Sequence, residues 1–266
     1  MLNRSDSGKH GLIGHSGFVG STLKRQHRFH DLFRSTDVHT IAGQEYDLLV
    51  CAGAPAKKWL ANQRPEEDRD SIDNLIKALS TVRCNTFVLI STVDVFSDPV
   101  GVDESAVVDL EGLHPYGLHR HGLEEFVRQH FASRLILRLP GLVGPGLKKN
   151  VIYDFHNNND LAKIDSRSIF QFYPMVNLWS DLQRAIGLGI DLLHLTAEPV
   201  SVREVSEAGF GIPFENLVLE RPPAYDFQTR FASSMGGQGR YTYSQRESLQ
   251  AVRAYAQTEP LAQPGG

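Results

Sequence analysis

A tyrosine and an arginine stand four positions apart in the stretch 114–127, and they are the pair best suited to chemistry. Apolar residues recur there at helical spacing, so Tyr116 and Arg120 should lie one turn apart on the same side of a helix. A guanidinium beside a phenol stabilises the phenolate. We therefore expect Arg120 to lower the pKa of Tyr116 from about 10 toward working pH, as general acid–base catalysis requires. The alternative is a surface pair without a function.

Two hydroxyls and a carboxylate follow the apolar, β-prone run 86–90. Ser91 and Thr92 come directly after this run, and Asp94 stands two positions further on. The run predicts a buried strand. Because ligands of open α/β sheets bind at the carboxyl ends of the strands, we expect these side chains at a ligand-binding edge.

Three glycines at regular spacing follow a short apolar run near the N-terminus. Gly14, Gly17 and Gly20 would let the chain turn tightly from a strand into a helix and approach a diphosphate closely. The N-terminal end of that helix would face the phosphates. The pattern predicts a dinucleotide site. Its spacing departs from the usual form, and an ordinary strand-to-helix turn is the alternative.

Predicted strands and helices alternate along the first half of the chain. The strands are expected at 31–34, 46–51 and 86–90. The helices are expected at 17–25, on a segment with Pro65 near its start and helical spacing of apolar residues from Ile72 to Leu79, and around Tyr116. This alternation implies right-handed crossovers and a parallel, doubly wound sheet of the α/β class.

Arg34 stands 20 positions after Gly14, where the end of the second strand would meet the adenosine ribose of a dinucleotide. An acidic residue there would bind a free 2′-hydroxyl, whereas an arginine followed by Ser35 and Thr36 suits a 2′-phosphate better. The segment therefore favours NADP over NAD, and a solvated surface arginine is the alternative.

The strand at 46–51 delivers three small residues to the same edge. Ala52, Gly53 and Ala54 leave room there for a ligand. Two lysines and a tryptophan follow at 57–59 and could face a phosphate or a base. An exposed basic loop is the safer assumption for them.

Composition excludes several classes of function. The chain has 266 residues, enough for a sizeable core, and its net charge of -4 gives no global attraction to nucleic acid or an anionic membrane. No stretch approaches the roughly 18 apolar residues of a membrane span, so we expect a soluble, cytoplasmic protein, with a polar arm at residues 1–8. We expect Cys51 and Cys84 to be buried free thiols, and no residues show metal-ligand spacing.

Four motifs together resemble the extended short-chain dehydrogenase/reductase family, which includes sugar-nucleotide epimerases, dehydratases and deoxysugar reductases. They occur in the family's order and cover about residues 9–205. The motifs are the glycine turn of Gly14, Gly17 and Gly20, Ser91-Thr92 followed by Val95-Phe96, Tyr116-x-x-x-Arg120 in the place of Tyr-x-x-x-Lys, and the arginine strand and Gly-Pro turn of 138–146.

This resemblance implies a Rossmann-type doubly wound parallel sheet with a small C-terminal substrate lobe. The dinucleotide-binding core would comprise residues 1–147, with 171–205 returning to it. Residues 148–170 and 206–258 would form the substrate lobe, and 259–266 a flexible tail.

The resemblance also implies roles for single residues. Tyr116 would be the acid–base residue and Thr92 would hydrogen-bond the same substrate oxygen. Arg120 would hold the nicotinamide ribose and tune the tyrosine, and Asp94 would be an auxiliary acid. The cofactor, NADP or alternatively NAD, would be held by Gly14, Gly17, Phe18, Val19, Gly20, Arg34, Ala52, Gly53, Ala54, Tyr116 and Arg120.

Two departures from the family pattern bear on the reaction. Arg120 replaces the family's lysine and cannot join a proton relay. Val93 stands where family dehydratases have the first of two acidic residues, which disfavours elimination. The pattern is most similar to deoxysugar-nucleotide reductases, so we expect reduction of a carbonyl on a nucleotide-linked deoxysugar. The alternatives are an epimerase or dehydratase that retains its cofactor, and a non-catalytic dinucleotide-binding sensor or scaffold. A homodimer through the tyrosine helix is plausible by the same resemblance.

Overall fold

The computed structural model describes residues 8–262, and these residues form two compact units. Unit 1 comprises the chain up to Ser97, together with Val108–Arg138 and Ala185–Leu192. Unit 2 comprises Asp98–Val107, Leu139–Arg184 and the chain from Leu193 onward. The residues expected to do chemistry all lie in unit 1.

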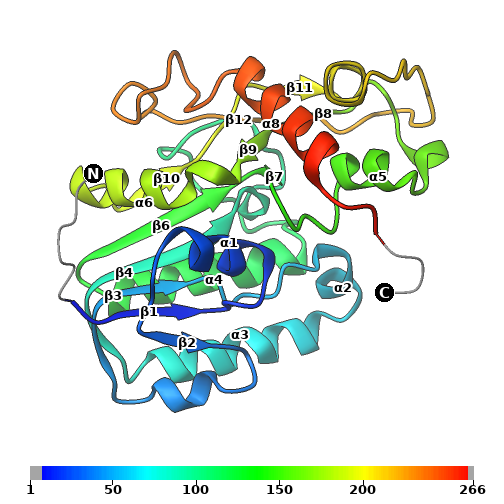
Figure 1. Ribbon diagram of the computed structural model, residues 1–266. Coiled ribbons are helices and arrows are strands. Elements are labelled where there is room, and N and C mark those ends of the chain that lie inside the picture. The colour runs from blue at the N-terminus through cyan, green and yellow to red at the C-terminus, as the bar shows by residue number, and fades with distance from the viewer. Residues whose placement is uncertain (1–7, 263–266) are drawn as a thin grey trace. The chain divides into compact units, whose positions relative to one another are not determined.

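A six-stranded sheet forms the centre of unit 1 (Figure 1). Its order is β10-β6-β4-β3-β1-β2. The strands are β1 (His10–Ile13), β2 (Asp31–Phe33), β3 (Glu45–Cys51), β4 (Arg83–Thr92), β6 (Arg134–Leu139) and β10 (Leu192–His194), at which the chain passes into unit 2. β1 pairs in parallel with β2 and β3, and β3 with β4, so the predicted parallel, doubly wound sheet is confirmed.

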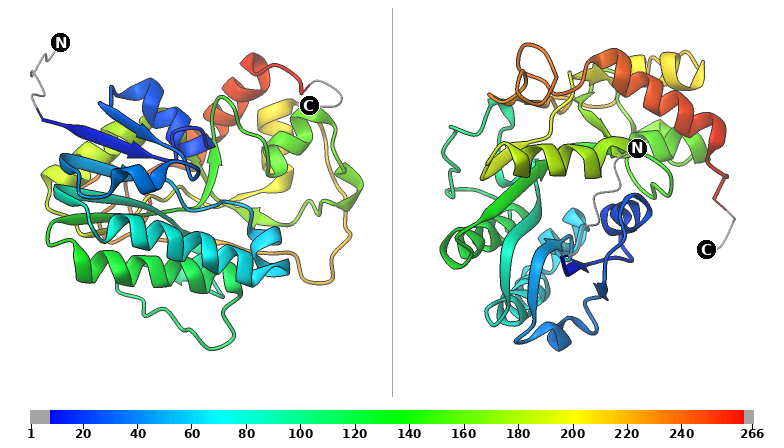
Figure 2. Two further views of the ribbon diagram at one scale, coloured as in Figure 1. Left: turned by 90° about the horizontal axis from the view of Figure 1, so that it is seen from below. Right: turned by 60° about the vertical axis from the view of Figure 1, so that its left-hand side comes forward.

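Helices cover both faces of this sheet. Figure 2 shows α3 and α4 side by side on one face and α1 on the other. The helices of unit 1 are α1 (Phe18–Gln26), α2 (Lys58–Gln63), α3 (Pro65–Leu79) and α4 (Pro115–His130), with short 3-10 turns at Val38–Ile41 and Val93–Val95. Pro65 opens α3 and three acidic side chains occupy its first turn, which suits the positive end of the helix dipole.

The core of unit 1 lies between the sheet and the pair α3 and α4. Ile72, Leu75 and Leu79 of α3 are buried there, as the helical spacing predicts. Phe87 of β4 stacks on Phe131 with ring centroids 4.0 Å apart. This packing fixes the C-terminal end of α4 against β4.

Unit 2 contains short strands and several helices. Its elements are β5 (Val100–Val102), β7 (Gly141–Val143), α5 (Val151–Asn157), β8 (Ile169–Phe170), β9 (Phe172–Pro174), β11 (Val200–Ser201), α7 (Val202–Glu204), β12 (Asp226–Phe227) and α8 (Gln245–Thr258), with 3-10 turns at Leu161–Lys163 and Met175–Asn177 and a π-helix at Val205–Phe210. The strands form three two-stranded sheets, β11-β8, β12-β5 and β7-β9. Helix α6 (Leu178–Gly187) begins in unit 2 and ends in unit 1.

The two units do not coincide with the predicted domains. Of the segment 171–205 expected to return to the core, residues 185–192 belong to unit 1. Compact units need not be folding domains, so the predicted boundaries stay a prediction. The expected tail is held at its start, because Glu259 accepts a hydrogen bond from the Gly146 amide at 2.8 Å and the Ala262 amide donates to Asn157 at 2.7 Å. Residues 1–7 of the polar arm and 263–266 of the tail lie outside the described residues.

The order of the strands reverses around β1. The chain runs from β1 to β2 on one side and then crosses to β3 on the other. Such a reversal leaves a crevice at the carboxyl ends of the two diverging strands, and ligands of open α/β sheets bind there. In this chain the glycine turn follows β1 and the small-residue loop follows β3.

Other expectations concern the chain as a whole. None of the helices formed by residues 8–262 is long and apolar enough to cross a bilayer. Within the same residues, no three His, Cys, Asp or Glu side chains gather closely enough to hold a metal ion. Both cysteines are free; Cys51 is buried as expected, whereas Cys84 is half-buried.

Candidate functional site

The glycine turn packs closely against the end of β3. Gly14 has a φ of +83°, and a side chain there would place Cβ 2.2 Å from the carbonyl oxygen of Ala52. A Cβ on Gly20, in the first turn of α1, would come within 2.1 Å of the Gly14 carbonyl oxygen. Both positions therefore require glycine. Ala52, Gly53 and Ala54 are half-buried beside this turn.

Gly17 lies at the open side of the turn. It is exposed, it is the N-cap of α1 without a side-chain cap, and its Cβ would have one neighbour within 4 Å, the Gly14 carbonyl oxygen at 3.5 Å. The first amide groups of a helix have no partner within it. Phe18 and Val19 open α1, so their amides can bind an anion that approaches over Gly17.

Arg34 lies beside the same turn. Its Nε donates to Nε2 of His15 at 3.4 Å, and its backbone amide donates to Asp37 at 2.6 Å. Burial lowers the pKa of His15, and the positive charges of Arg34 and Lys24 lower it further, so the imidazole is neutral at neutral pH. The positive charges of Arg34 and Lys24 thus lie near the turn where the sequence predicts a 2′-phosphate, and the carboxylate of Asp37 lies near it as well.

Tyr116 and Arg120 are buried, so the alternative of a surface pair is wrong. The exposed fractions are 8% for Tyr116 and 3% for Arg120. The central guanidinium carbon of Arg120 lies over the phenol ring, 3.9 Å from its centroid. The sequence predicted the spacing, and the structure adds that the cation stacks on the ring face.

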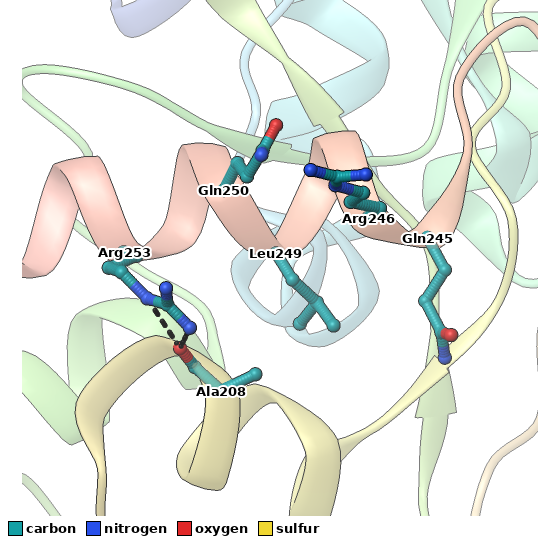
Figure 3. A pocket seen from close by; sticks show the side chains of 6 residues that line it. All are labelled: Ala208, Gln245, Arg246, Leu249, Gln250 and Arg253. Carbon is teal, nitrogen blue, oxygen red and sulfur yellow. Dashed lines mark hydrogen bonds between the residues drawn. The ribbon is translucent and has the colours of Figure 1, made fainter.

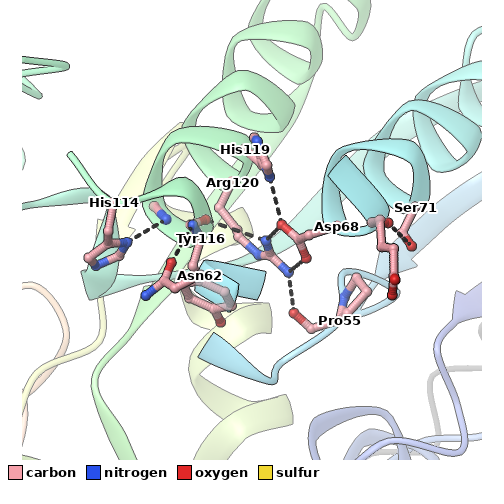
Figure 4. A network of polar contacts seen from close by, with 10 residues as sticks. Pro55, Asn62, Asp68, Ser71, His114, Tyr116, His119 and Arg120 are labelled. Carbon is pink, nitrogen blue, oxygen red and sulfur yellow. Dashed lines mark hydrogen bonds and ion pairs between the residues drawn. The ribbon is translucent and has the colours of Figure 1, made fainter. Parts of the chain in front are cut away.

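Arg120 is held by acceptors of the protein (Figure 4). Both terminal nitrogens donate to the carboxylate of Asp68, one of them at 2.8 Å. They also donate to the carbonyl oxygens of Pro55 and, at 3.4 Å, Tyr116. The four terminal N–H groups are thereby engaged, so these groups can bind a ribose only if one of them exchanges its acceptor.

The expectation that Tyr116 has a lowered pKa is wrong. Burial raises the pKa of the phenol above 10 and outweighs the positive charge of Arg120, which lowers it as expected. The nearby carboxylate of Asp94 raises the pKa further, and a hydrogen bond with Thr92 lowers it. Tyr116 therefore keeps its proton at neutral pH.

Asp68 connects α3 to the tyrosine helix. It is 7% exposed, and besides Arg120 it binds Nδ1 of His119 at 2.7 Å. Burial alone would raise the pKa of Asp68, but hydrogen bonds from Arg120 and His119 outweigh it and lower the pKa. Asp68 lies in the helix predicted near Pro65, and no pattern in the sequence indicated this contact.

The beginning of α4 is fixed by two polar contacts. The Tyr116 amide donates to Oδ1 of Asn62, and the Gly117 amide donates to Nδ1 of His114, each at 3.0 Å. Burial, followed by the charge of Lys58, lowers the pKa of His114, which keeps the ring neutral and able to accept. Gly117 is required because its Cβ would lie 2.2 Å from the Asp94 carbonyl oxygen. Tyr116 is therefore placed by the backbone as well as by Arg120.

Thr92 ends β4, Asp94 follows the strand, and the two residues contact each other. The Asp94 amide donates to the Thr92 hydroxyl at 3.1 Å, and that hydroxyl lies 3.4 Å from an Asp94 carboxylate oxygen. Lys58 donates to the other carboxylate oxygen at 2.7 Å. Lys58, treated as part of an exposed basic loop in the sequence, is thus a further residue of the site.

Ser91 does not belong to the ligand-binding edge. Its hydroxyl is buried and donates to Glu124 at 2.5 Å. Arg138 of β6 donates to the same carboxylate at 2.6 Å, and Glu124 is fully buried. These contacts join β4, α4 and β6, so Ser91 stabilises the fold.

A surface depression of unit 2 contains none of the expected site residues (Figure 3). Arg253, which lines it, donates to the Ala208 carbonyl at 2.8 and 3.0 Å. Its lining residues are Ala208, Gln245, Arg246, Leu249, Gln250 and Arg253.

Solved structures share this fold along nearly the whole chain. The enzyme WbmG of Bordetella bronchiseptica, solved with NAD, has a TM-score of 0.76 at 15% identity, covering 98% of this chain and 100% of that one. A dTDP-4-dehydrorhamnose reductase from Bacillus anthracis, solved with NADP, has a TM-score of 0.70 at 15% identity and covers 93% and 97%. A UDP-glucose 4-epimerase from Thermotoga maritima has a TM-score of 0.68 at 14% identity and covers 94% and 98%.

No protein-family profile and no curated protein matches the chain. The likeness to the solved structures rests on the arrangement of the backbone, and it agrees with the four sequence motifs. The chain therefore has the Rossmann-type fold of the extended short-chain dehydrogenase/reductase enzymes.

Proposed function

We propose that this protein is an NADP-preferring reductase that acts on a carbonyl group of a nucleotide-linked deoxysugar. The observation that carries the proposal is the state of Tyr116. Its phenol is buried under a guanidinium, is hydrogen-bonded with Thr92, and has a pKa raised above 10. A phenol that keeps its proton at neutral pH can donate it to a carbonyl oxygen.

The residues of unit 1 fit a dinucleotide. Gly17 leaves an open approach to the first amides of α1, which would hold the diphosphate. Arg34 and the neighbouring positive charge would hold the 2′-phosphate. Ala52, Gly53 and Ala54 would line the crevice. The bound cofactor would supply the hydride, and two of the solved structures named above contain NAD or NADP.

The protein's own residues would handle the proton. Tyr116 O–H would donate its proton to the carbonyl oxygen as the carbon is reduced, and the Thr92 hydroxyl would hydrogen-bond the same oxygen. Arg120, stacked on the ring, would stabilise the phenolate that remains. Asp94 is ion-paired with Lys58, so it is a weaker candidate for a base than for an auxiliary group beside Thr92.

The nucleotide-sugar substrate is supported by the relatives in structure. The B. anthracis protein is named as a dTDP-4-dehydrorhamnose reductase, and one WbmG structure also contains UDP. The threonine, aspartate and Val-Phe at the end of β4 resemble the reductases, and Val93 removes the acidic pair of the dehydratases.

One observation favours a second candidate, a dinucleotide-binding protein without chemistry. The acceptors of Asp68, Pro55 and Tyr116 engage the terminal N–H groups of Arg120, which replaces the lysine of the family pattern. Such a protein would bind NADPH and would function in cells with phenylalanine in place of Tyr116. An epimerase or dehydratase would instead be purified with tightly bound nucleotide.

The test follows NADPH consumption with a panel of 4-keto sugar nucleotides. We expect Tyr116→Phe to lower the rate by about 10²- to 10⁴-fold, because the proton donor is lost. Tyr46→Phe, which removes a hydroxyl of β3 that is bonded to Asp31 of β2, should leave the rate unchanged. Since reduction needs the protonated phenol, the wild-type rate should not fall from loss of this proton until the pH exceeds 10.

Equal rates for the wild type and Tyr116→Phe would refute Tyr116 as the proton donor. NADPH binding without turnover of any carbonyl substrate would favour the non-catalytic candidate.

A further inference from the structure

A buried carboxylate on α3 fixes the cation of the tyrosine helix. Asp68 contacts both terminal nitrogens of Arg120 across 52 positions of sequence, and the side chains are 5% and 3% exposed. A two-nitrogen pairing of this kind sets the plane of the guanidinium as well as its position. That plane lies over the Tyr116 ring.

The other acceptors complete the fixation. Pro55, in the loop after β3, and the carbonyl of Tyr116 accept from the same two nitrogens. In the residues that the structure describes, Nε of Arg120 is buried without a hydrogen-bond acceptor. Acceptors of the protein therefore hold the guanidinium through its terminal nitrogens. Asp68 is the one charged group among these acceptors.

We propose that Asp68 is a positioning residue that holds Arg120 over the Tyr116 ring before any cofactor binds. This proposal rests on the proposed function only for the role of Tyr116 as proton donor. In the family pattern that this chain resembles, the lysine of Tyr-x-x-x-Lys also binds the cofactor ribose. Here the equivalent cation is committed to a carboxylate of its own chain, so its place over the phenol does not depend on the ribose.

The arrangement also has an electrostatic consequence. Arg120 lowers the pKa of Tyr116, whereas Asp68 and Asp94 raise it, and the Thr92 hydroxyl lowers it by a hydrogen bond. Asp68 thus holds the cation in place and partly offsets its charge. The phenol is left protonated, as a proton donor in reduction has to be.

Nuclear magnetic resonance of the Arg120 side chain tests the position directly. Protons held over the face of an aromatic ring are shifted upfield, so the Arg120 side-chain signals should be upfield in the wild type without cofactor. Arg120→Lys identifies the Nε–H signal by its disappearance. The samples are the full chain as wild type, Asp68→Asn, Asp68→Glu and Glu67→Gln, the last being a matched control on the exposed side of α3.

We expect the upfield shift to be lost in Asp68→Asn, to return at least in part in Asp68→Glu, and to be unchanged in Glu67→Gln. An unchanged shift in Asp68→Asn would overturn the proposal. If Asp68→Asn does not fold, the wild type alone still tests the proposal. An upfield shift that arises only on addition of NADPH would mean that the cofactor, and not Asp68, positions Arg120 over the ring, and would overturn the proposal.

The same samples separate this proposal from the proposed function. No substrate is needed to observe the Arg120 signals, and NADPH is titrated afterwards. Failure of NADPH to bind, with the Asp68 dependence intact, would count against the proposed function and leave the positioning role of Asp68 standing.

Discussion

The glycine turn and the tyrosine helix differ in what holds them. The turn from Gly14 to Gly20 is held by close backbone packing, of Gly20 on the Gly14 carbonyl within the turn and of Gly14 on the Ala52 carbonyl after β3. The tyrosine helix receives its decisive partner, Asp68, from α3. The glycines that such close backbone packing requires can be recognised in the sequence, whereas the electrostatic environment of Tyr116 depends on side chains that are far away in sequence and have no pattern of their own.

Breaking the distant contact should have the largest effect on stability. Asp68→Ala removes one partner of a buried ion pair and leaves the Arg120 charge uncompensated, so we expect a loss of about 3–5 kcal/mol in the free energy of unfolding. Urea denaturation measures it. Glu67→Ala, next to Asp68 on α3 but exposed, should change the free energy by less than about 0.5 kcal/mol.

The pH dependence of this loss has a definite sign. The folded-state pKa of Asp68 is below 3.8, so its contribution is fully present above pH 3.8 and is lost as the pH falls through the folded-state value. The difference between wild type and Asp68→Ala should therefore be constant near neutral pH and shrink in acid. A difference that grows in acid would contradict the ion pair.

Two glycines of the turn should respond differently to the same change. Gly20→Ala places a methyl group 2.1 Å from a carbonyl oxygen and should cost about 1–3 kcal/mol of unfolding free energy. The methyl group of Gly17→Ala would lie 3.5 Å from the Gly14 carbonyl oxygen, so we expect a cost below about 1 kcal/mol. It should still weaken NADPH binding, because the methyl group occupies the approach to the α1 amides. Denaturation and calorimetric titration check the pair, and equal stability losses would contradict the geometry.

The glycine turn and the sheet could be predicted because their signals are local. Apolar runs and helical spacing predicted the strands and helices of the sheet. The separation of 20 positions from Gly14 predicted that Arg34 lies beside the glycine turn. The ligand edge was predicted less well. Ser91 and Thr92 are adjacent, but alternation along β4 buries Ser91 against Glu124 and leaves Thr92 half-buried at the end of the strand.

The pKa of Tyr116 could not be predicted from sequence because it depends on burial. Spacing correctly indicated a cation beside the phenol, but the depth of the phenol and the negative charges of Asp68 and Asp94 reverse the net direction. Lys58 likewise gave no signal, because its partner Asp94 is 36 positions away. Such long-range contacts are set by the packing of α2, α3 and α4.

Titration of NADPH and NADH into the wild type and Arg34→Ala tests the central claim most directly. We expect NADPH to bind more tightly than NADH, and Arg34→Ala to weaken NADPH by about 10- to 100-fold through loss of a charged hydrogen bond while leaving NADH nearly unchanged. Arg28→Ala, which removes an exposed arginine after α1, should change neither affinity. If neither nucleotide binds the folded wild type, the proposed dinucleotide site and reductase activity are contradicted, and only the description of the fold stands.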